Sequence, residues 1–563
     1  MRAALRNSIL PVLSTMALVA SSVPARAQVP ESVGFVESSQ RPLRVYYNTQ
    51  DNAALAQHML DAAEAAWTAE IDGMGFAVPV TVDDQGAPVP GMRIYLVRDS
   101  NIAGHVVALG DIPGTPRTDC AAITLVSDSM PSWYLPNLLA HEFNHACQFA
   151  VECTDSNFAF EQITVAVTTT LYPEDSFLDT VFADFQREPE RPLFYVDWGS
   201  YYHYGASLFS YFLDQTYGAG DGRLLARIWD ATAQPGEVLF DRDGLPYTTA
   251  PNEPDLIDAM TTVLAEEAVV FADAFTRFSE ARYFIGRNDD GKHIRGAAQW
   301  RGAEVAIDTD LALDQLPLSK LAPHRAPQIL GTSFLSLDLA GAPAQHVLRV
   351  RFDGDPQMQW RPQLLTLGHP PNQALPVDVD AQGHGQVLIE DVDLLQRVVV
   401  AVANLGSEEP DPESFRVQGG EFTLDLAMLN CAEPSLSSSS PSTLTPGQDT
   451  TLTIQGQGFW SDQEMVLALS GTGARVVDVE RLSDTELRAT IRVDAGATPG
   501  ARDLSLGLEC GAQTTSLDVL EVVPEAGCQC HQATRTTPAT LVLGLLMLGV
   551  LRRRHETILQ RRA

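Results

Sequence analysis

The chain has 563 residues, of which 45% are hydrophobic and 19% charged, and its 72 acidic residues outnumber its 37 basic ones. This length is sufficient for several domains, each with its own hydrophobic core. The formal net charge of −35 argues against nucleic acids and anionic membranes as partners, because they carry charge of the same sign. It favours a soluble protein that attracts divalent cations, although the sequence contains no recognisable calcium-binding loop.

The first residues have the features of a secretory signal peptide. Arg2 and Arg6 make the start positive, an apolar run follows, and Ala25 and Ala27 belong to a small-residue cleavage site. Because the apolar run is short and a cleavage site follows it, we expect residues 1–27 to direct export and then to be removed.

Strand-like and helical patterns alternate in the next part of the chain. A helical pattern covers residues 53–71, and helical segments continue to about residue 287. Strand-like runs lie near residues 42–48, 93–97 and 121–126. This mixture predicts an α+β lobe over residues 28–300, with a sheet beside the helix of the motif that follows.

The residues His141-Glu142-Phe143-Asn144-His145 form an HExxH motif within an apolar segment. On a helix, residues four apart lie one turn above each other, so both imidazoles can bind one metal ion. Zinc prefers nitrogen ligands in a tetrahedral shell, and a catalytic zinc leaves one position to water. Glu142 can reach that water as general base. A solvated helix face is the alternative, but polar groups in an apolar helix are costly unless something satisfies them.

A complete site needs a third protein ligand, and three acidic residues follow the motif. Glu152 and Asp155 lie in a predicted turn, close to the end of the first helix. Glu161 opens the next apolar segment, so a second helix would bring its carboxylate, in the helix's first turn, to the histidines. We therefore predict a zinc ion held by His141, His145 and Glu161.

An aromatic cluster downstream supplies candidates for stabilising the oxyanion of a hydrolytic reaction. Metalloproteases commonly place a Tyr or His donor opposite the zinc. Tyr204 and His203 are the candidates in this chain, and ordinary packing of the aromatic cluster is the alternative.

The cysteines indicate two disulfide bonds in an exported protein. Cys431 and Cys510 bracket one late domain and are predicted to pair. One further pair is expected among Cys120, Cys147 and Cys153, and the sequence leaves the choice open. Cys147 faces a different side of the motif helix from the two histidines, which disfavours it as a zinc ligand.

Three segments together resemble a family of secreted zinc metalloproteases from myxobacteria and other bacteria. They are AHEFNHACQF, FEQITVAVTTTLYPED and YHYGASLFSYFLDQTYG, within a similarity that runs from about residue 44 to residue 230. In that family a Glu opens an EATA-like segment and a Tyr-Pro pair follows eleven residues later, an interval that Glu161 and Tyr172-Pro173 keep. Relatives often carry a second acid seven residues after that Glu, where this chain has Thr168. The resemblance implies a gluzincin-like metallopeptidase.

The second half of the chain has the pattern of all-β domains. Short alternating runs separated by Gly, Pro and Asp predict a β-sandwich over residues 316–430, which is similar to the pre-peptidase C-terminal domains of secreted proteases. The segment SLSSSSPSTLTPG has the composition of a low-complexity linker. The strands that follow predict a second sandwich over residues 431–523. Its PGQDTTLTIQGQGF and ATPGARDLSL segments resemble the IPT/TIG immunoglobulin-like fold.

The C-terminus combines GCQC at residues 527–530, the apolar run PATLVLGLLMLGVL and three arginines at residues 552–554. The run is short for a membrane span, and the trailing arginines are typical of a cytoplasmic stop. Residues 527–563 together resemble the myxobacterial sorting signal called MYXO-CTERM. The resemblance implies contact with the membrane through this segment, processing near the cysteines and display at the cell surface. A plain tail anchor is the alternative.

The sequence thus predicts a multidomain protein, with an α+β zinc-metalloprotease lobe followed by two all-β sandwich domains. We expect a secreted or surface-displayed metallopeptidase that cleaves a protein or peptide substrate. The alternative is a surface adhesion protein on an inactive protease scaffold, which Thr168 and the two β domains favour. The intact His141-Glu142-His145 set argues against that alternative. The substrate and the oligomeric state are left open by the sequence.

Overall fold

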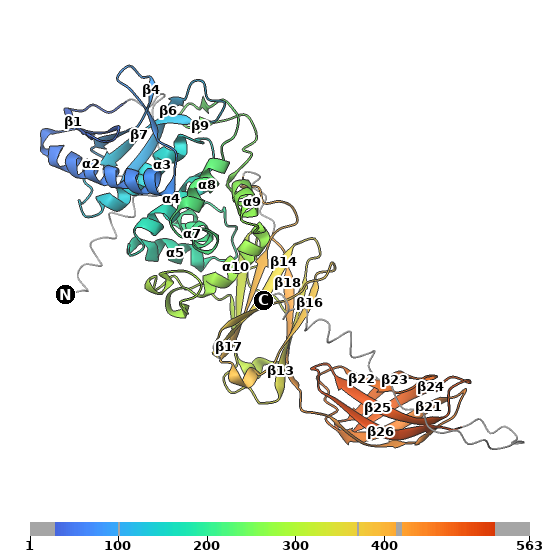
Figure 1. Ribbon diagram of the computed structural model, residues 1–563. Coiled ribbons are helices and arrows are strands. Elements are labelled where there is room, and N and C mark those ends of the chain that lie inside the picture. Colours follow the sequence, from blue (N-terminus) through green and yellow to red (C-terminus); the bar gives the residue numbers. More distant parts are fainter. Residues whose placement is uncertain (1–28, 100–101, 369–370, 413–418, 524–563) are drawn as a thin grey trace, which may run out of the picture. The chain divides into compact units, whose positions relative to one another are not determined.

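The computed structural model describes residues 29–99, 102–368, 371–412 and 419–523. The chain divides into two compact units, Met1–Ala432 and Glu433–Ala563 (Figure 1). The first unit contains a lobe of helices with a mixed sheet, followed by a β-sandwich, and the second contains another β-sandwich. The predicted multidomain organisation, with β-domains at the C-terminus, is confirmed.

The predicted export signals lie outside the described residues. These are the signal peptide at residues 1–27 and the sorting signal at residues 527–563. Within the part of the chain that the structure covers, no helix combines the length and the apolar character needed to cross a membrane.

A five-stranded mixed sheet forms one layer of the lobe, in the order β1-β2-β5-β7-β6. Its strands are β1 (Gly34–Glu37), β2 (Leu43–Tyr47), β5 (Met92–Val97), β6 (Gly104–Asp111) and β7 (Cys120–Ser127). Strands β2, β5 and β7 are parallel, whereas β1 and β6 are antiparallel to their neighbours. Nearly every residue of β7 is buried, because this strand lies inside the sheet and is covered by a helix and by the short strand β3 (Val80–Val82). Strand β6 is left at the edge of the sheet.

Two long helices pack on the sheet and on each other (Figure 1). Helix α2 (Ala53–Trp67) contacts β2 and α3 and continues into the π-helical turn η2 (Thr68–Met74). Helix α3 (Leu135–Phe149) contacts β6 and β7 on one side and α4 (Asn157–Leu171) on another. A proline occupies the first turn of α3, where its missing N–H costs no helical hydrogen bond.

The start of α4 corrects one detail of the sequence prediction. Ser156 caps this helix by accepting a hydrogen bond from the Ala159 backbone N–H. The helix therefore begins at Asn157. Glu161 lies one turn further into the helix than the predicted first turn.

The remaining helices form a second layer around α4 and α7, and one hydrophobic core extends through the lobe. They are α5 (Phe177–Arg187), α6 (Tyr202–Gly205), α7 (Ser207–Tyr217), α8 (Arg223–Ala231), α9 (Leu256–Glu266) and α10 (Phe271–Tyr283). The short strand pairs of the lobe are β3 (Val80–Val82) with β4 (Pro88–Pro90), and β8 (Leu239–Phe240) with β9 (Pro246–Tyr247).

The first sandwich consists of two sheets, in the orders β10-β12-β17-β14-β15 and β11-β18-β13-β16. Its first strand begins at Thr309, upstream of the predicted start at residue 316. The first sheet contains β10 (Thr309–Leu311), β12 (Gly331–Asp338), β14 (Trp360–Leu367), β15 (Gln373–Pro376) and β17 (Arg397–Asn404). The second contains β11 (Leu318–Leu321), β13 (His346–Gly354), β16 (His384–Ile389) and β18 (Phe422–Asn430).

One face of this sandwich packs directly on the lobe. Tyr283 and Phe284 at the end of α10, together with Val305, share a hydrophobic cluster with Phe334 of β12 and Val399 of β17. This contact explains why β12 and β17 are buried on both faces and read as continuous apolar runs. The sandwich therefore forms one unit with the lobe.

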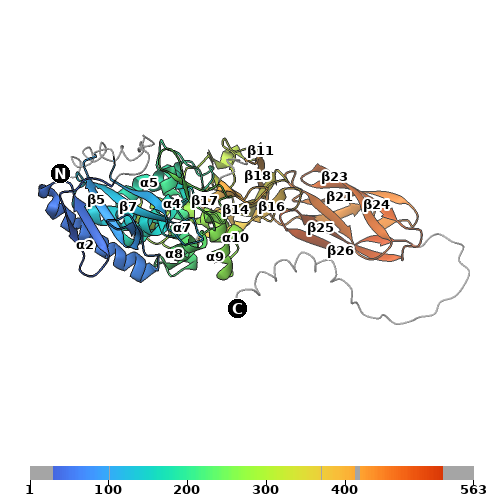
Figure 2. The ribbon, with the colours of Figure 1, turned by 90° about the horizontal axis from the view of Figure 1, so that it is seen from above.

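The second sandwich also consists of two sheets, β19-β21-β24-β23 and β20-β26-β25-β22 (Figure 2). Its strands are β19 (Ser435–Ser440), β20 (Thr443–Leu444), β21 (Asp449–Gln457), β22 (Met465–Leu469), β23 (Ala474–Ser483), β24 (Glu486–Val493), β25 (Gly500–Leu508) and β26 (Gln513–Val522). The segment SLSSSS, predicted to be a linker, is the edge strand β19. It pairs with β21 while most of its serine side chains stay exposed, so the hydroxyl-rich composition is compatible with a strand at the sheet edge.

The structure also settles the disulfide bonds that the sequence left open. Cys120 at the start of β7 pairs with Cys153 in the turn between α3 and α4. Cys147 is free and buried. Cys431 and Cys510 are both disulfide-bonded, in agreement with the predicted pair.

Candidate metal centre

Helices α3 and α4 bring three predicted ligand residues to one point. The Nε2 atoms of His141 and His145 lie 3.2 Å apart. The Oε2 atom of Glu161 lies 3.4 Å from the Nε2 atom of His141 and 3.6 Å from that of His145. Glu161 thus lies beside the HExxH motif, whereas the two rejected candidates, Glu152 and Asp155, are held by other contacts.

These separations fit a tetrahedral zinc site. Two ligand atoms that each lie ~2.1 Å from a tetrahedral zinc ion are ~3.4 Å apart. The Oε2 atom of Glu161 is buried and accepts no hydrogen bond of normal geometry from the residues that the structure describes. Two imidazole nitrogens and one carboxylate oxygen are also a donor set that zinc prefers. The residues present therefore fit a zinc ion.

The charges of His145 and Glu161 depend on each other. Burial by itself would lower the pKa of His145, but the Glu161 carboxylate outweighs it and holds that pKa at about 9. Burial likewise opposes ionisation of Glu161, yet the two imidazoles hold its pKa well below the usual range. A cation at this point would therefore meet the ionised carboxylate of Glu161. A metal ion can take the place of the proton on the His145 imidazole.

A side chain one turn along α3 orients His145. The Nδ1 atom of His145 lies 2.8 Å from Oε1 of Gln148, whose Nε2 atom donates to the Phe160 carbonyl at 3.1 Å. Because the amide oxygen can only accept, it selects the tautomer with a proton on Nδ1. The Nε2 lone pair of His145 then faces Glu161. The i, i+3 spacing of His145 and Gln148 is the signal that sequence reasoning missed.

A buried polar network continues behind this contact. The Thr164 hydroxyl on α4 lies 2.9 Å from Oε1 of Gln148 and 2.9 Å from Oδ1 of Asn144. Asn144 donates in turn to Oε2 of Glu70 at 3.0 Å. Glu70 is fully buried, and burial raises its pKa well above the ordinary value. The network links α3, α4 and the π-helical turn η2 directly behind the candidate metal ligands.

Glu142 does not belong to the group of ligand atoms that converge at this point, which are those of His141, His145 and Glu161. Its side chain is only 4% exposed, and its Oε2 atom has no hydrogen-bond partner among the described residues. Burial raises the pKa of Glu142, while the neighbouring His141 and His145 oppose that rise. A carboxylate that binds a proton readily is suited to the role of general base.

The edge strand β6 approaches Glu142 very closely. A Cβ atom at Gly104 would overlap the carboxyl group of Glu142, so only glycine permits this approach. The next residue, His105, lies near enough to His145 and Glu161 to interact with them electrostatically. Sequence reasoning missed both residues, because β6 meets the motif only through the fold.

The two predicted oxyanion donors have different positions. The Tyr204 ring stacks on His141, with centroids 6.4 Å apart and an interplanar angle of 13°. Burial and the nearby Glu161 carboxylate raise the pKa of Tyr204 well above its ordinary value, so its hydroxyl keeps the proton. His203 is 2% exposed and packs against the rings of Trp198 and Tyr204, at 5.5 and 4.7 Å. Tyr204 is therefore the better placed donor, and His203 supports its ring.

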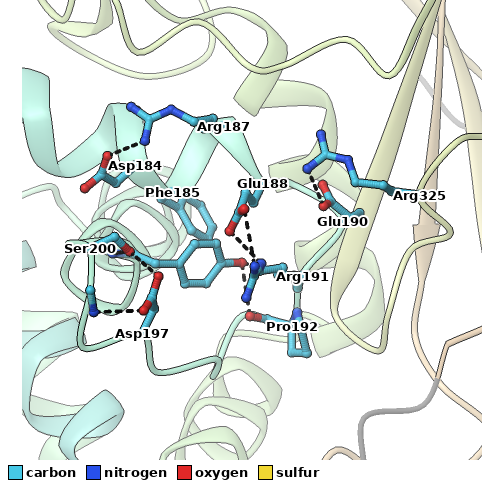
Figure 3. A network of polar contacts seen from close by, with 12 residues as sticks. Asp184, Phe185, Arg187, Glu188, Glu190, Arg191, Pro192, Asp197, Ser200 and Arg325 are labelled. Carbon is cyan, nitrogen blue, oxygen red and sulfur yellow. Dashed lines mark hydrogen bonds and ion pairs between the residues drawn. The ribbon is translucent and has the colours of Figure 1, made fainter.

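A polar network in the preceding loop positions the short helix α6 (Figure 3). Asp197 accepts hydrogen bonds from the Ser200 hydroxyl and the Gly199 backbone N–H, both at 2.8 Å. The hydroxyl of Tyr202 donates to the carbonyls of Arg191 and Pro192, at 3.1 Å each. These contacts hold the backbone that leads into α6, the helix that carries Tyr204.

The same loop is attached to the first sandwich. Arg325, which lies between β11 and β12, forms an ion pair with Glu190 at 2.7 Å (Figure 3). The Glu190 carbonyl also accepts a hydrogen bond from the Gln328 backbone N–H at 2.8 Å. The sandwich thus contributes to the position of the loop that leads to α6.

One comparison with known proteins places a family model on the last domain. The family model described as quinohemoprotein amine dehydrogenase, alpha subunit domain III, matches residues 433–519, which form the second sandwich. A solved structure, the ZirS C-terminal domain, is 11% identical over 16% of this chain and 66% of that chain, with a TM-score of 0.13. The chain thus spans just under two thirds of that structure. No curated protein matches the chain.

Proposed function

We propose that this protein is a zinc metallopeptidase. The observation that carries the proposal is the mutual separation of the His141, His145 and Glu161 ligand atoms, at 3.2, 3.4 and 3.6 Å. These distances agree with the ~3.4 Å edge of a tetrahedral zinc site. The resemblance of residues 44–230 to secreted zinc metalloproteases supports the same function.

His141, His145 and Glu161 would hold the metal, and Gln148 keeps the lone pair of His145 directed at it. A bound zinc ion supplies Lewis-acid chemistry, which lowers the pKa of a water molecule and polarises a substrate carbonyl. Glu142 accepts a proton at its unpartnered Oε2 atom and can return it to the leaving amine. The protonated hydroxyl of Tyr204 donates to the oxyanion that develops on the substrate.

The glycine at position 104 has a role in this mechanism. Its missing side chain lets the β6 backbone lie against Glu142, which excludes water from one side of the carboxyl group. The resulting desolvation favours the protonated form of Glu142 after it has taken a proton.

We also propose that the peptidase is exported and displayed at the cell surface. The predicted signal peptide and the C-terminal segment that resembles MYXO-CTERM support this location. The net charge of −35 supports a protein or peptide substrate rather than nucleic acid.

The proposal is tested by zinc analysis of the purified protein together with cleavage of casein and peptides, with and without a chelator. The wild type should bind one zinc ion and lose activity with the chelator. Glu142→Gln should keep the zinc and lose about 10²–10⁴-fold in activity, because the general base is removed. The exposed Glu174→Gln is the matched control and should behave as the wild type. Cleavage by Glu142→Gln at the wild-type rate would refute Glu142 as the base, and zinc binding without any cleavage would favour an inactive binding protein.

A further inference from the structure

The segment that joins α5 to α6 is bound to the first sandwich by backbone hydrogen bonds at two successive residues. The Pro189 carbonyl accepts a hydrogen bond from the Thr332 N–H at 2.7 Å, and the Glu190 carbonyl accepts one from the Gln328 N–H at 2.8 Å. The carboxylate of Glu190 also forms an ion pair with Arg325 at 2.7 Å (Figure 3). A backbone held at consecutive residues has little freedom to shift, so the sandwich fixes the position of this segment.

A glycine of the sandwich makes this contact especially close. Gly331 is the first residue of β12, and a Cβ atom at this position would overlap the carbonyl group of Glu190. The overlapped atoms belong to the backbone, which cannot move aside as the end of a flexible side chain could. Any larger residue at position 331 must therefore displace the segment that contains Glu190.

A buried arginine ties the same segment to the end of α5. Arg282 of α10 is 1% exposed, and its guanidinium carbon lies 4.2 Å from the centroid of the Phe185 ring. The guanidinium donates to Oε1 of Gln186 at 2.8 Å, and to the carbonyls of Phe185 and Pro189 at 3.4 Å each. The Gln186 carbonyl accepts a further hydrogen bond from the Ala306 N–H, just before the sandwich begins, at 2.9 Å. The end of α5 and the segment after it are therefore fixed relative to each other and to the sandwich.

The short helix α6, which carries Tyr204, contacts both of these parts. The side chain of Tyr202 is fully buried, and its hydroxyl donates to the carbonyls of the two residues that directly follow Glu190, at 3.1 Å each. A Cβ atom at Gly205 would overlap α5, so α6 lies directly against that helix. Because α6 has only four residues, a displacement of the segment at Glu190 reaches Tyr204 through Tyr202.

We propose that the first sandwich positions the oxyanion donor Tyr204, with Gly331 and Arg325 as the positioning residues. This role rests on the proposed function, in which the Tyr204 hydroxyl stabilises the transition state. Each step from β12 to α6 is a hydrogen bond, an ion pair or a backbone contact between described residues. A misplacement of about 1 Å can cost about 10²-fold in rate, so a small change at this interface should affect the reaction. The sandwich is thus part of the catalytic unit rather than an appended binding module.

The test compares two glycine variants of the full chain, Gly331→Ala and the matched control Gly419→Ala. Gly419 forms a β-bridge with Gln328, and a Cβ atom there meets no atom of the described residues within 4 Å. Gly331→Ala should lower kcat for peptide cleavage about tenfold or more, because Tyr204 acts in the transition state. Its KM should stay within a few-fold of the wild type and its zinc affinity should be unchanged. Gly419→Ala should behave as the wild type in all three measurements.

A double-mutant cycle separates a positioning role from a general structural one. In the Tyr204→Phe background the donor hydroxyl is absent, so Gly331→Ala should cause no further loss of kcat. Additive losses in the double variant would overturn the proposal, because the sandwich would then act on a group other than Tyr204.

A milder variant covers the case in which Gly331→Ala does not fold. Arg325→Ala removes the ion pair with Glu190 and leaves the packed interface in place. It should lower kcat by about two- to fivefold, as expected for a partly exposed ion pair, and Arg325→Lys should restore part of that loss. The loss should again be absent in the Tyr204→Phe background.

Hydrogen exchange gives a second measurement that does not depend on peptidase activity. The N–H groups of Tyr201 and Gly205 are hydrogen-bonded, at 2.9 Å each, and report on the attachment of α6. Backbone amides of residues 199–206 should exchange faster in Gly331→Ala or Arg325→Ala than in Gly419→Ala, while those of α3 stay unchanged. If this difference is found but the wild type cleaves no peptide, the proposed function fails and the coupling of the sandwich to α6 stands. Equal exchange at residues 199–206 in the folded variants would overturn the proposal.

Discussion

The candidate metal centre and the turn that holds Glu152 and Asp155, here called the acidic turn, are two buried polar clusters on the same pair of helices. They balance charge in opposite ways. At the metal centre, two imidazoles face the Glu161 carboxylate. In the turn, Glu152 and Asp155 face only hydroxyls, amides and backbone N–H groups. The comparison shows that burial alone does not determine how a carboxyl group behaves, because the neighbouring donors decide its charge.

The pKa values of the carboxyl groups express this difference. The two imidazoles hold the pKa of Glu161 well below the usual range despite its burial. Burial dominates in the turn, where it raises the pKa of Glu152 and brings that of Asp155 to about 7. The first cluster thus contains an ionised carboxylate beside two imidazoles, and the second contains a carboxyl group that takes up a proton readily.

The largest expected effect is a difference in zinc affinity between two variants, each of which lacks the carboxylate of one cluster. Glu161→Ala should lower zinc affinity by about 10²-fold or more, because it removes one of three protein ligands. The matched change Glu152→Ala should leave zinc affinity within a few-fold of the wild type. Competition with a chromophoric chelator measures both. Equal losses in the two variants would show that Glu161 is not a ligand.

A smaller effect is expected from the side chain that orients His145. Gln148→Leu removes the acceptor for the Nδ1 proton and should lower zinc affinity by about 10–100-fold. Gln162→Leu is the control, since this buried amide adjoins Glu161 in sequence but donates to Ser210. The control should change stability and leave zinc affinity unaltered. A zinc affinity of Gln148→Leu equal to that of the control would contradict the orienting role.

The smallest expected effect concerns the acidic turn and the pH dependence of the stability of the metal-free protein. The pKa of Asp155 is raised from 3.8 to about 7 by burial, so the stability that the neutral acid contributes is fully present below pH 3.8. That stability is lost as pH rises through about 7. The wild type should therefore lose a few degrees of Tm over this range relative to Asp155→Asn, which carries no titrating group there. Calorimetry at a series of pH values measures Tm for both proteins. If the two Tm profiles ran parallel, the raised pKa would not belong to Asp155.

The convergence of His141, His145 and Glu161 could be predicted from the sequence because it depends largely on local geometry. The spacing of His141 and His145 on one helix follows from the helical repeat, and the apolar segment that starts near Glu161 indicated a second helix. The two sandwiches were predictable for the same reason, since alternation along a strand is also local. The strand β19 (Ser435–Ser440) was missed, because its serines lie at an exposed sheet edge, where the hydrophobic pattern is weak.

Only the tertiary structure decided which residues surround His141, His145 and Glu161, and which residues contact the acids of the acidic turn. Gly104 meets Glu142, and Cys120 pairs with Cys153, through the packing of β6 and β7 against α3 and the turn after it. The acidic turn receives Thr118, Gln234 and Asn252 from separate segments of the chain. No sequence interval encodes these contacts. A helix sets the spacing of its own side chains by covalent geometry, whereas residues on different segments meet only when the packed core brings those segments together.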